Sequence, residues 1–224
     1  MLEGEFEHED SAGHRGTLRP GDVQWMTAGA GIVHSEMPSA EIRRNGGRVH
    51  GFQIWVNLPA SDKMHRPRYQ ELSARQIPTG RNADGRAEVR VIAGQALGVQ
   101  AAIDTRIPIT FQDWTLKSGA DVSVDIPASE QAMVYVFAGA LQVGDDERVI
   151  GEGQLARLGD GERARLRHAG DGTTRALLLA GKPLNEPVAR YGPFVMNNEA
   201  ELRQAFADYQ SGKMGEITRE AQVG

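Results

Sequence analysis

The stretch PGDVQWMTAGAGIVHSEMP, residues 20–38, ends with a histidine and a carboxylate two positions apart, His34 and Glu36. Side chains two residues apart on a β-strand project from the same face, so these two groups would point into one space. A neutral imidazole nitrogen and an anionic carboxylate oxygen are both ligands for divalent transition metals. The stretch therefore predicts a strand with two metal ligands, although a solvated pair or a satisfied core histidine also fits the local pattern.

Around this stretch, glycine and proline divide the chain into short segments. The sequence contains 27 Gly and 10 Pro, and most of it reads as short strands joined by tight turns, which indicates an all-β barrel or sandwich. A late helix is expected at residues 198–211, with Asn197 or Asn198 as its N-cap and Gly212 as its stop. The expected strands cover residues 2–7, 16–18, 23–26, 31–37, 50–58, 87–93, 109–116, 121–126, 133–139, 141–143, 154–158, 162–168 and 175–181.

The chain also repeats one pattern, in which a strand, a glycine, a second strand and a glycine-containing turn follow one another. Gly4 and Gly21 mark the first copy, and Gly139 and Gly153 mark the second at a similar interval. The pattern favours one barrel-building unit used twice, although shared glycine-rich composition is an alternative. The expected domains are a first barrel at 1–74, a polar linker at 75–86, a second barrel at 87–197, and a helix with its tail at 198–224.

Composition excludes several classes of function. The chain has 224 residues, a net charge of −5 and 40% hydrophobic residues, and it has no basic stripe that would bind nucleic acid. It contains no cysteine, which excludes disulfides, thiolate metal ligands and a cysteine nucleophile. The acidic opening and the absence of a long apolar run predict a cytoplasmic protein without a membrane partner.

Three further segments carry a family resemblance. Residues 51–59 read GFQIWVNLP, residues 179–187 read LAGKPLNEP, and residues 192–197 read GPFVMN. Together with residues 20–38, they resemble the pirin family over essentially the whole chain. The resemblance implies an all-β double cupin with a C-terminal helix. It also implies one non-haem iron in the first barrel, held by three His and one Glu, and in some members the opening of the flavonol quercetin with O₂.

The resemblance assigns two of those four iron ligands to this sequence. His34 and Glu36 match the second ligand pair, and Glu36 is also the expected catalytic proton acceptor. The other two ligands belong to a His-x-His on a strand that precedes the family's Tyr-Leu-Leu-Glu-Gly, where this sequence opens with Met1 and Leu2. The chain is therefore expected to begin within a strand, with its first barrel truncated at the N-terminus.

The remaining histidines are weaker metal-ligand candidates. His8 and His14 lie around the first predicted hairpin, His50 opens the 50–58 strand at the expected barrel mouth, and His65 and His168 are expected at the surface.

The second barrel carries no metal signal, because its His-x-His positions hold Asp125 and Pro127, and it is expected to be a scaffold. In the first barrel, alternating strand residues are expected to line a substrate cavity, with ordinary barrel core as the alternative. These residues are Gln24, Met26, His50, Gln53 and Trp55.

The expected function is a metal-dependent dioxygenase that uses O₂ on an aromatic, flavonol-like substrate such as quercetin, provided that the His-x-His strand is present. Fe(II) is the expected metal, although another divalent transition metal would suit the same ligands. The alternatives are a non-catalytic cupin scaffold that binds or regulates a protein partner, and an inactive, metal-poor fragment. Neither nucleic acid nor a membrane is an expected partner.

Overall fold

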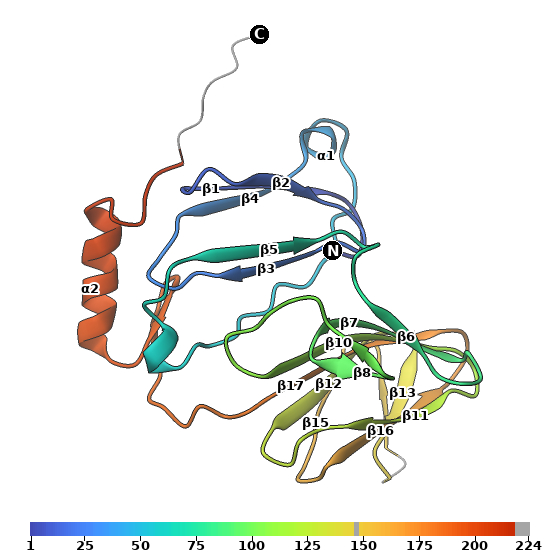
Figure 1. Cartoon of the computed structure of the whole chain (residues 1–224). Helices are drawn as coiled ribbons and strands as arrows, with labels where there is room; N and C mark the ends of the chain where they lie inside the picture. The colour runs from blue at the N-terminus through green and yellow to red at the C-terminus, as the bar shows by residue number, and fades with distance from the viewer. Residues whose placement is uncertain (146–147, 218–224) are drawn as a thin grey trace. The chain divides into compact units, whose positions relative to one another are not determined.

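The computed structural model describes residues 1–145 and 148–217, and strands dominate it (Figure 1). The chain forms two compact units, the first made of Met1–Ala74 with Asn185–Gly224 and the second of Arg75–Leu184. The chain thus leaves the first unit, builds the second, and returns. No helix among the described residues is both long and apolar enough to cross a membrane.

The second unit contains two antiparallel sheets. The six-stranded sheet has the order β15-β12-β17-β10-β7-β6, and the four-stranded sheet has the order β11-β16-β13-β14. A short hairpin of β8 (Gln95–Ala96) and β9 (Val99–Gln100) completes the unit. The strands of the two sheets are β6 (Thr79–Arg81), β7 (Ala87–Ala93), β10 (Ile109–Leu116), β11 (Asp121–Asp125), β12 (Gln131–Ala138), β13 (Ala140–Val143), β14 (Val149–Gly151), β15 (Leu155–Arg157), β16 (Arg163–Ala169) and β17 (Thr174–Gly181).

Alternation along these strands explains the core of the second unit. In β7 and β11, apolar residues alternate with charged or polar ones, and the apolar positions are the buried ones, as expected when one face of each strand packs inward. Between β12 and β13 the chain turns at Gly139, where φ is +73° and a Cβ would lie 3.0 Å from the carbonyl oxygen of Thr173. The largest fully buried side chains in the resulting core are Trp114, Leu116, Leu141, Leu166 and Leu178.

The first unit contains a three-stranded sheet of order β2-β1-β4 and a separate antiparallel pair, β3 and β5 (Figure 1). A hairpin of β18 and β19 and three short or medium helices complete it. The strands are β1 (Phe6–Asp10), β2 (Arg15–Leu18), β3 (Val23–Thr27), β4 (His34–Pro38), β5 (Arg68–Leu72), β18 (Ala189–Tyr191) and β19 (Phe194–Met196), and the helices are α1 (Ala40–Asn45), η1 (Ala60–Asp62) and α2 (Glu199–Gln210).

The late helix forms as the sequence predicts. The side chain of Asn198 accepts a hydrogen bond from the Glu201 backbone N–H at 3.0 Å, which caps the start of α2. Beyond its end, Gly212 adopts a φ of +78°. Phe206 of α2 packs edge-on against Phe194, with ring centroids 4.9 Å apart, so the helix is fastened to the β18–β19 hairpin.

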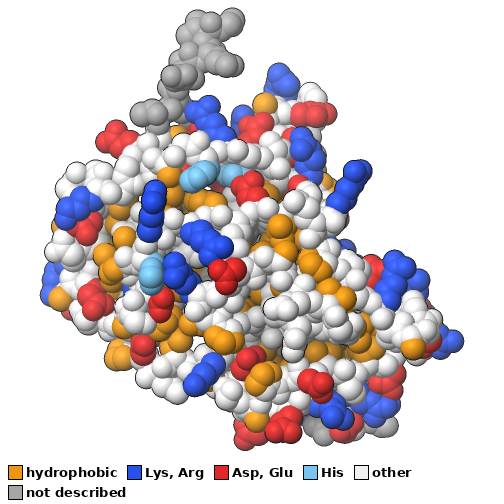
Figure 2. Space-filling model, viewed as in Figure 1, with side chains coloured by type: hydrophobic (Ala, Val, Ile, Leu, Met, Phe, Trp, Pro, Cys, Tyr) orange, Lys and Arg blue, Asp and Glu red, His pale blue; other side chains and the backbone are white. Residues whose placement is uncertain are grey.

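Several segments differ from expectation, among them β5, which was not predicted, and the segments at 50–58 and 75–86. Residues 50–58, predicted as a strand, form one bridge between His50 and Glu3 and no other strand pairing among the described residues, because an alternating pattern specifies a face and not a partner. The side chains of Ile54, Trp55 and Val56 are exposed, and apolar groups reach the surface in several places (Figure 2). The expected linker instead contains β6, which pairs with β7 and belongs to the second unit.

Candidate functional site

Strand register gathers four ionisable groups on one face of the first unit. In the β1–β4 pair, His8 lies opposite Glu36 and Asp10 lies opposite His34. Residues directly opposite one another in an antiparallel pair share a face. The two predicted ligands therefore lie beside two acid–base groups from β1. His34 Nδ1 is 3.9 Å from Glu36 Oε1, and about one third of each side chain is exposed, at 33% and 35%.

The segment at residues 50–58, after α1, also reaches this face. Gln53 Nε2 donates a hydrogen bond to Glu36 Oε2 at 3.2 Å. One oxygen of the Glu36 carboxylate is thus oriented by an amide, while the other faces the imidazole of His34. Gln53 contacts the predicted ligand even though its segment is not part of a sheet.

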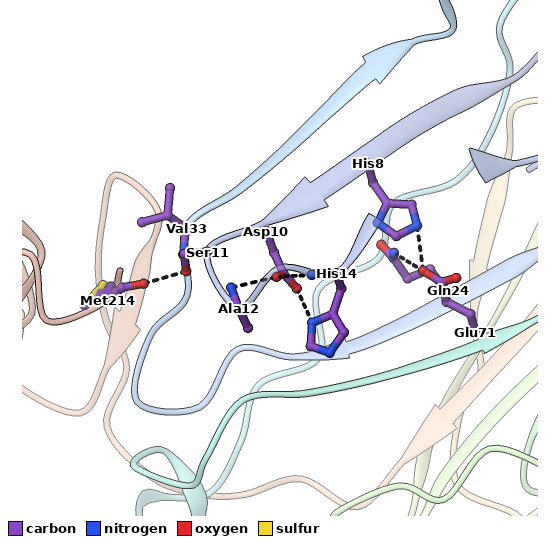
Figure 3. Close-up of polar contacts among 9 residues, drawn as sticks. All are labelled: His8, Asp10, Ser11, Ala12, His14, Gln24, Val33, Glu71 and Met214. Atoms are coloured by element: carbon purple, nitrogen blue, oxygen red, sulfur yellow. Dashed lines mark hydrogen bonds and ion pairs between the residues drawn. The ribbon is translucent and has the colours of Figure 1, made fainter. Parts of the chain in front are cut away.

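Strands β3 and β5 contribute further polar side chains to the first unit. Gln24 lies opposite Glu71, and Met26 lies opposite Tyr69, so these four residues share a face. Glu71 Oε1 accepts a hydrogen bond from Gln24 Nε2 at 2.9 Å and lies 2.6 Å from Nε2 of the buried His8 (Figure 3). Because Gln24 and His8 meet at one carboxylate, β3, β5 and β1 are joined by polar contacts.

The ring of His8 needs a glycine beside it. A Cβ placed on Gly16 of β2 would collide with the imidazole of His8, and it would also crowd the carboxylate of Glu71 at 3.1 Å. Gly16 lies opposite His8 in the β1–β2 register. The absence of a side chain at Gly16 therefore lets the His8–Glu71 contact form.

Asp10 is the most tightly held carboxylate of the cluster. It is buried, and its Oδ2 lies 2.8 Å from His14 Nδ1, while its Oδ1 accepts backbone hydrogen bonds from Ala12 at 2.8 Å and His14 at 3.0 Å (Figure 3). Burial acts to raise the pKa of Asp10, but these hydrogen bonds outweigh it and leave the pKa below its usual value. Asp10 is therefore an anion at neutral pH.

Tyr69 brings a neutral hydroxyl to the same cluster. Its ring lies 5.5 Å from the ring of His14. Burial raises the pKa of Tyr69 well above its usual value, and the negative charges of Asp10, Glu36 and Glu71 raise it further. The phenol therefore keeps its proton at neutral pH and adds no charge to the cluster.

A serine fastens the loop beside the cluster. Ser11 Oγ donates to the carbonyl oxygen of Met214 at 2.6 Å and accepts from the Val33 backbone N–H at 3.1 Å (Figure 3). Val33 immediately precedes β4, so this contact ties the entry of the His34 strand to the chain beyond α2.

The other predicted residues make different contacts. His50 forms the bridge with Glu3 and an edge contact with Phe52, with ring centroids 5.7 Å apart. Trp55 is 57% exposed, and the guanidinium of Arg190 lies 5.3 Å from its ring centroid.

Outside the cluster, His65 pairs with Asp62 at 3.1 Å. In the second unit, His168 contacts the carbonyl oxygen of Gly172 at 2.8 Å, and Asp125 pairs with Arg163 at 3.3 Å.

The distance between the two predicted ligands can be compared with that in a metal site. Two ligands at about 2.1 Å from one ion lie at most about 4.2 Å apart, and about 3.0 Å apart when they are at right angles, as in a facial site. The 3.9 Å between His34 Nδ1 and Glu36 Oε1 is below the first limit and longer than the facial distance. Within residues 1–145 and 148–217, no group of three or more His, Cys, Asp or Glu is placed to hold a metal ion. The pair supplies two donors, and a facial site needs at least one more.

Sequence reasoning missed Asp10, Tyr69 and Glu71 and considered His8 only as a substitute ligand. A signal exists, because His8 and Asp10 in FEHED are two residues apart, as are Tyr69 and Glu71 in RYQEL. That spacing predicts that each pair shares a face. It does not predict that both pairs meet the face of His34 and Glu36.

Comparison with known proteins gives consistent matches. The sequence model of the pirin family matches residues 1–56, and that of the pirin C-terminal cupin domain matches residues 111–215. A pirin-like protein of Solanum lycopersicum is 44% identical over 216 residues, which cover 96% of this chain and 72% of that protein.

Solved structures agree in fold. A crystal structure of a quercetin 2,3-dioxygenase from Acinetobacter baumannii is 37% identical, with a TM-score of 0.86, and the match covers 97% of this chain and 75% of that one. A bacterial pirin from Escherichia coli in complex with nickel(II) is 21% identical with a TM-score of 0.62, over 81% of this chain and 70% of that one. The prediction of an all-β double cupin with a C-terminal helix is confirmed.

Proposed function

We propose that this chain, which belongs to the pirin family, is a metal-dependent dioxygenase of the quercetin 2,3-dioxygenase type, acting on a flavonol such as quercetin with O₂. The observation that carries the proposal is the His34–Glu36 pair, which converges on one face of β4. The 37% identity to a quercetin 2,3-dioxygenase structure supports the substrate class.

The proposed metal is Fe(II), with another divalent transition ion compatible with the same donors. The family resemblance assigns the two further donors to a His-x-His, and these 224 residues contain no such motif. When bound, the metal would act as a Lewis acid toward the substrate oxygens and would bring O₂ beside the flavonol.

The residues of this chain have roles that follow from their contacts. Glu36 is proposed both as a ligand and as the group that accepts the proton of the flavonol hydroxyl, with Gln53 fixing its second oxygen. Partial exposure leaves both ligand side chains accessible to a small molecule.

The test uses a chain extended before Met1 by the His-x-His segment of the Acinetobacter enzyme. We expect about one equivalent of bound metal, with quercetin consumption and matching O₂ uptake. His34→Ala and Glu36→Ala should each lose bound metal and turnover, whereas His168→Ala, in the second unit, should leave both unchanged. Turnover that survives both ligand substitutions would overturn the proposal.

A second candidate is a non-catalytic cupin scaffold that binds or regulates a protein partner. It is favoured by the finding that only two metal donors converge among the described residues. The same extended chain separates the two functions: a full equivalent of tightly held metal without any consumption of quercetin would favour the scaffold.

A further inference from the structure

The second unit contains a cavity of about 240 Å³ that the proposed metal site does not use. Its inner wall is apolar, and three of the wall residues are alanines, whose short side chains leave space unfilled. The exposed loop at residues 159–161 also lines the cavity, so a small molecule can enter there from solvent. The wall residues that belong to the buried core cluster or pack against it include Ile126, Ala132, Val143, Ile150, Ala156 and Ala164.

Glu130 places a carboxyl group at this apolar wall. It immediately precedes β12, and Ala132, two residues further along, is buried in the core. Side chains two residues apart along a strand share a face, so the strand pattern turns Glu130 toward the same interior. Its backbone N–H donates to the carbonyl oxygen of Pro127 at 2.8 Å, so a tight turn fixes its position.

The carboxyl group of Glu130 lacks a partner. Its Oε2 is closed off from solvent and makes no hydrogen bond with any residue that the structure describes. Burial raises the pKa of this carboxyl group, because burial disfavours the charged form. A buried polar atom without a hydrogen bond is costly, so a ligand that offers one matching polar group here would remove that cost.

Arg157 and Arg163 border the cavity but point away from its inner wall. Arg157 lies opposite Met133, whose side chain is 37% exposed. Arg163 lies opposite Asp125 and pairs with it at 3.3 Å. Successive side chains of a strand face opposite ways, so both arginines project away from the buried face that carries the cavity-lining alanine next to each of them. Neither arginine brings positive charge to the wall beside Glu130, which favours an uncharged ligand.

We propose that this cavity binds a small uncharged molecule with an apolar body and one hydroxyl group, and that the hydroxyl contacts Glu130. A hydroxyl suits Glu130 in either protonation state, because it can donate to the carboxylate or accept from the acid. An ammonium group would suit only the ionised form, which burial disfavours. An apolar cavity of about 150 Å³ can hold one benzene ring, and sites for drug-sized ligands begin at about 300 Å³, so the cavity has room for about one ring.

The probe is phenol, titrated calorimetrically into the full chain. We expect saturable binding of phenol, and about tenfold weaker binding of toluene, in which a methyl group replaces the hydroxyl, because one hydrogen bond is lost. Benzylamine, a cation at neutral pH, should also bind more weakly than phenol. Glu130→Leu should weaken phenol about tenfold and leave toluene unchanged or tighter, so the preference for the hydroxyl should disappear.

Methyl resonances locate the bound phenol. Phenol should shift the methyl resonances of the cavity residues Ile126, Val143 and Ile150 and leave those of Val33, beside the proposed metal ligands, unchanged. This readout separates the cavity from the proposed flavonol site in the first unit. His34→Ala should accordingly leave phenol binding unchanged.

Matched controls separate binding from folding. Glu130→Leu removes a buried carboxyl group without a partner, so its melting temperature should equal or exceed that of the parent. Glu152→Leu, at an exposed turn of the same unit, should leave phenol binding unchanged. The proposal is overturned if phenol shows no saturable binding at millimolar concentration, or if it shifts the Val33 methyl resonances and not those of the cavity. It is also overturned if Glu130→Leu binds phenol as tightly as the parent does, or if benzylamine binds more tightly than phenol.

Discussion

The two units bury opposite kinds of side chain. Among the described residues, the buried side chains of the first unit are mostly polar or charged, with Leu202 and Met214 as its buried hydrophobic residues. The second unit buries a continuous apolar cluster around Trp114 and Leu116. The buried polar residues of the first unit are His8, Asp10, Thr27, Ser39 and Lys63. The second unit thus derives its stability from apolar burial, while the first relies more on hydrogen bonds and ion pairs.

This difference also concerns function. Buried acid–base groups are costly unless they are paired, and chains keep them mainly where their chemistry is used. In the first unit His8, Asp10 and Glu71 are each paired, and they surround the face that carries His34 and Glu36. The second unit also buries an acid, Asp113, which is paired with Arg175 at 2.8 Å and with Arg90 at 3.4 Å.

The largest expected effect concerns the apolar core of the second unit. Trp114→Ala removes a fully buried indole that donates to Gln112 Oε1 at 2.8 Å, and it should lower the free energy of unfolding by about 3–5 kcal/mol, measured by urea denaturation. The control is Trp55→Ala, at a side chain that is 57% exposed, which should cost less than about 1 kcal/mol. Equal losses in the two variants would contradict the contrast between the units.

A smaller effect tests the packing of the polar cluster. Gly16→Ala should lower the free energy of unfolding by about 1–3 kcal/mol, because the new methyl would collide with the ring of His8. Gly159→Ala is the control, since a Cβ there meets nothing within 4 Å. In a spectrum of the imidazole protons, Gly16→Ala should also shift the His8 resonance, and an unchanged spectrum would show that the His8–Glu71 contact does not depend on Gly16.

The smallest expected effect concerns the charge of Asp10 in the first unit. The pKa of Asp10 is lower in the folded chain than in the unfolded chain, so its stabilisation is present above about pH 3.9 and is lost as the pH falls through the folded value. Asp10→Asn should therefore lower the free energy of unfolding by about 1–2 kcal/mol at pH 7. As the pH is lowered, the free energy of unfolding of this variant should fall less steeply than that of the parent. Urea denaturation across pH 2–7 measures both. If the free energies of unfolding of the parent and of Asp10→Asn fell equally at low pH, Asp10 would have the same pKa in the folded and unfolded chain.

Local periodicity predicted much of the fold. The strands at 87–93 and 109–116 have the predicted limits, because their alternation and flanking turn residues are local signals. The helix at Glu199–Gln210 has its predicted cap for the same reason. Strand β5 was not predicted, since RYQEL is mostly polar and becomes a strand only by pairing with β3.

By itself, the sequence determined that the chain is an all-β double cupin and that His34 and Glu36 share one face of a strand, because a strand has a period of two. Only the tertiary structure decided what lies opposite them. Strand pairing and register are non-local, so the meeting of His8, Asp10, Tyr69 and Glu71 depends on which strands pair and in which register. The return of the chain from the second unit into the first is likewise a property of packing, to which no local pattern corresponds.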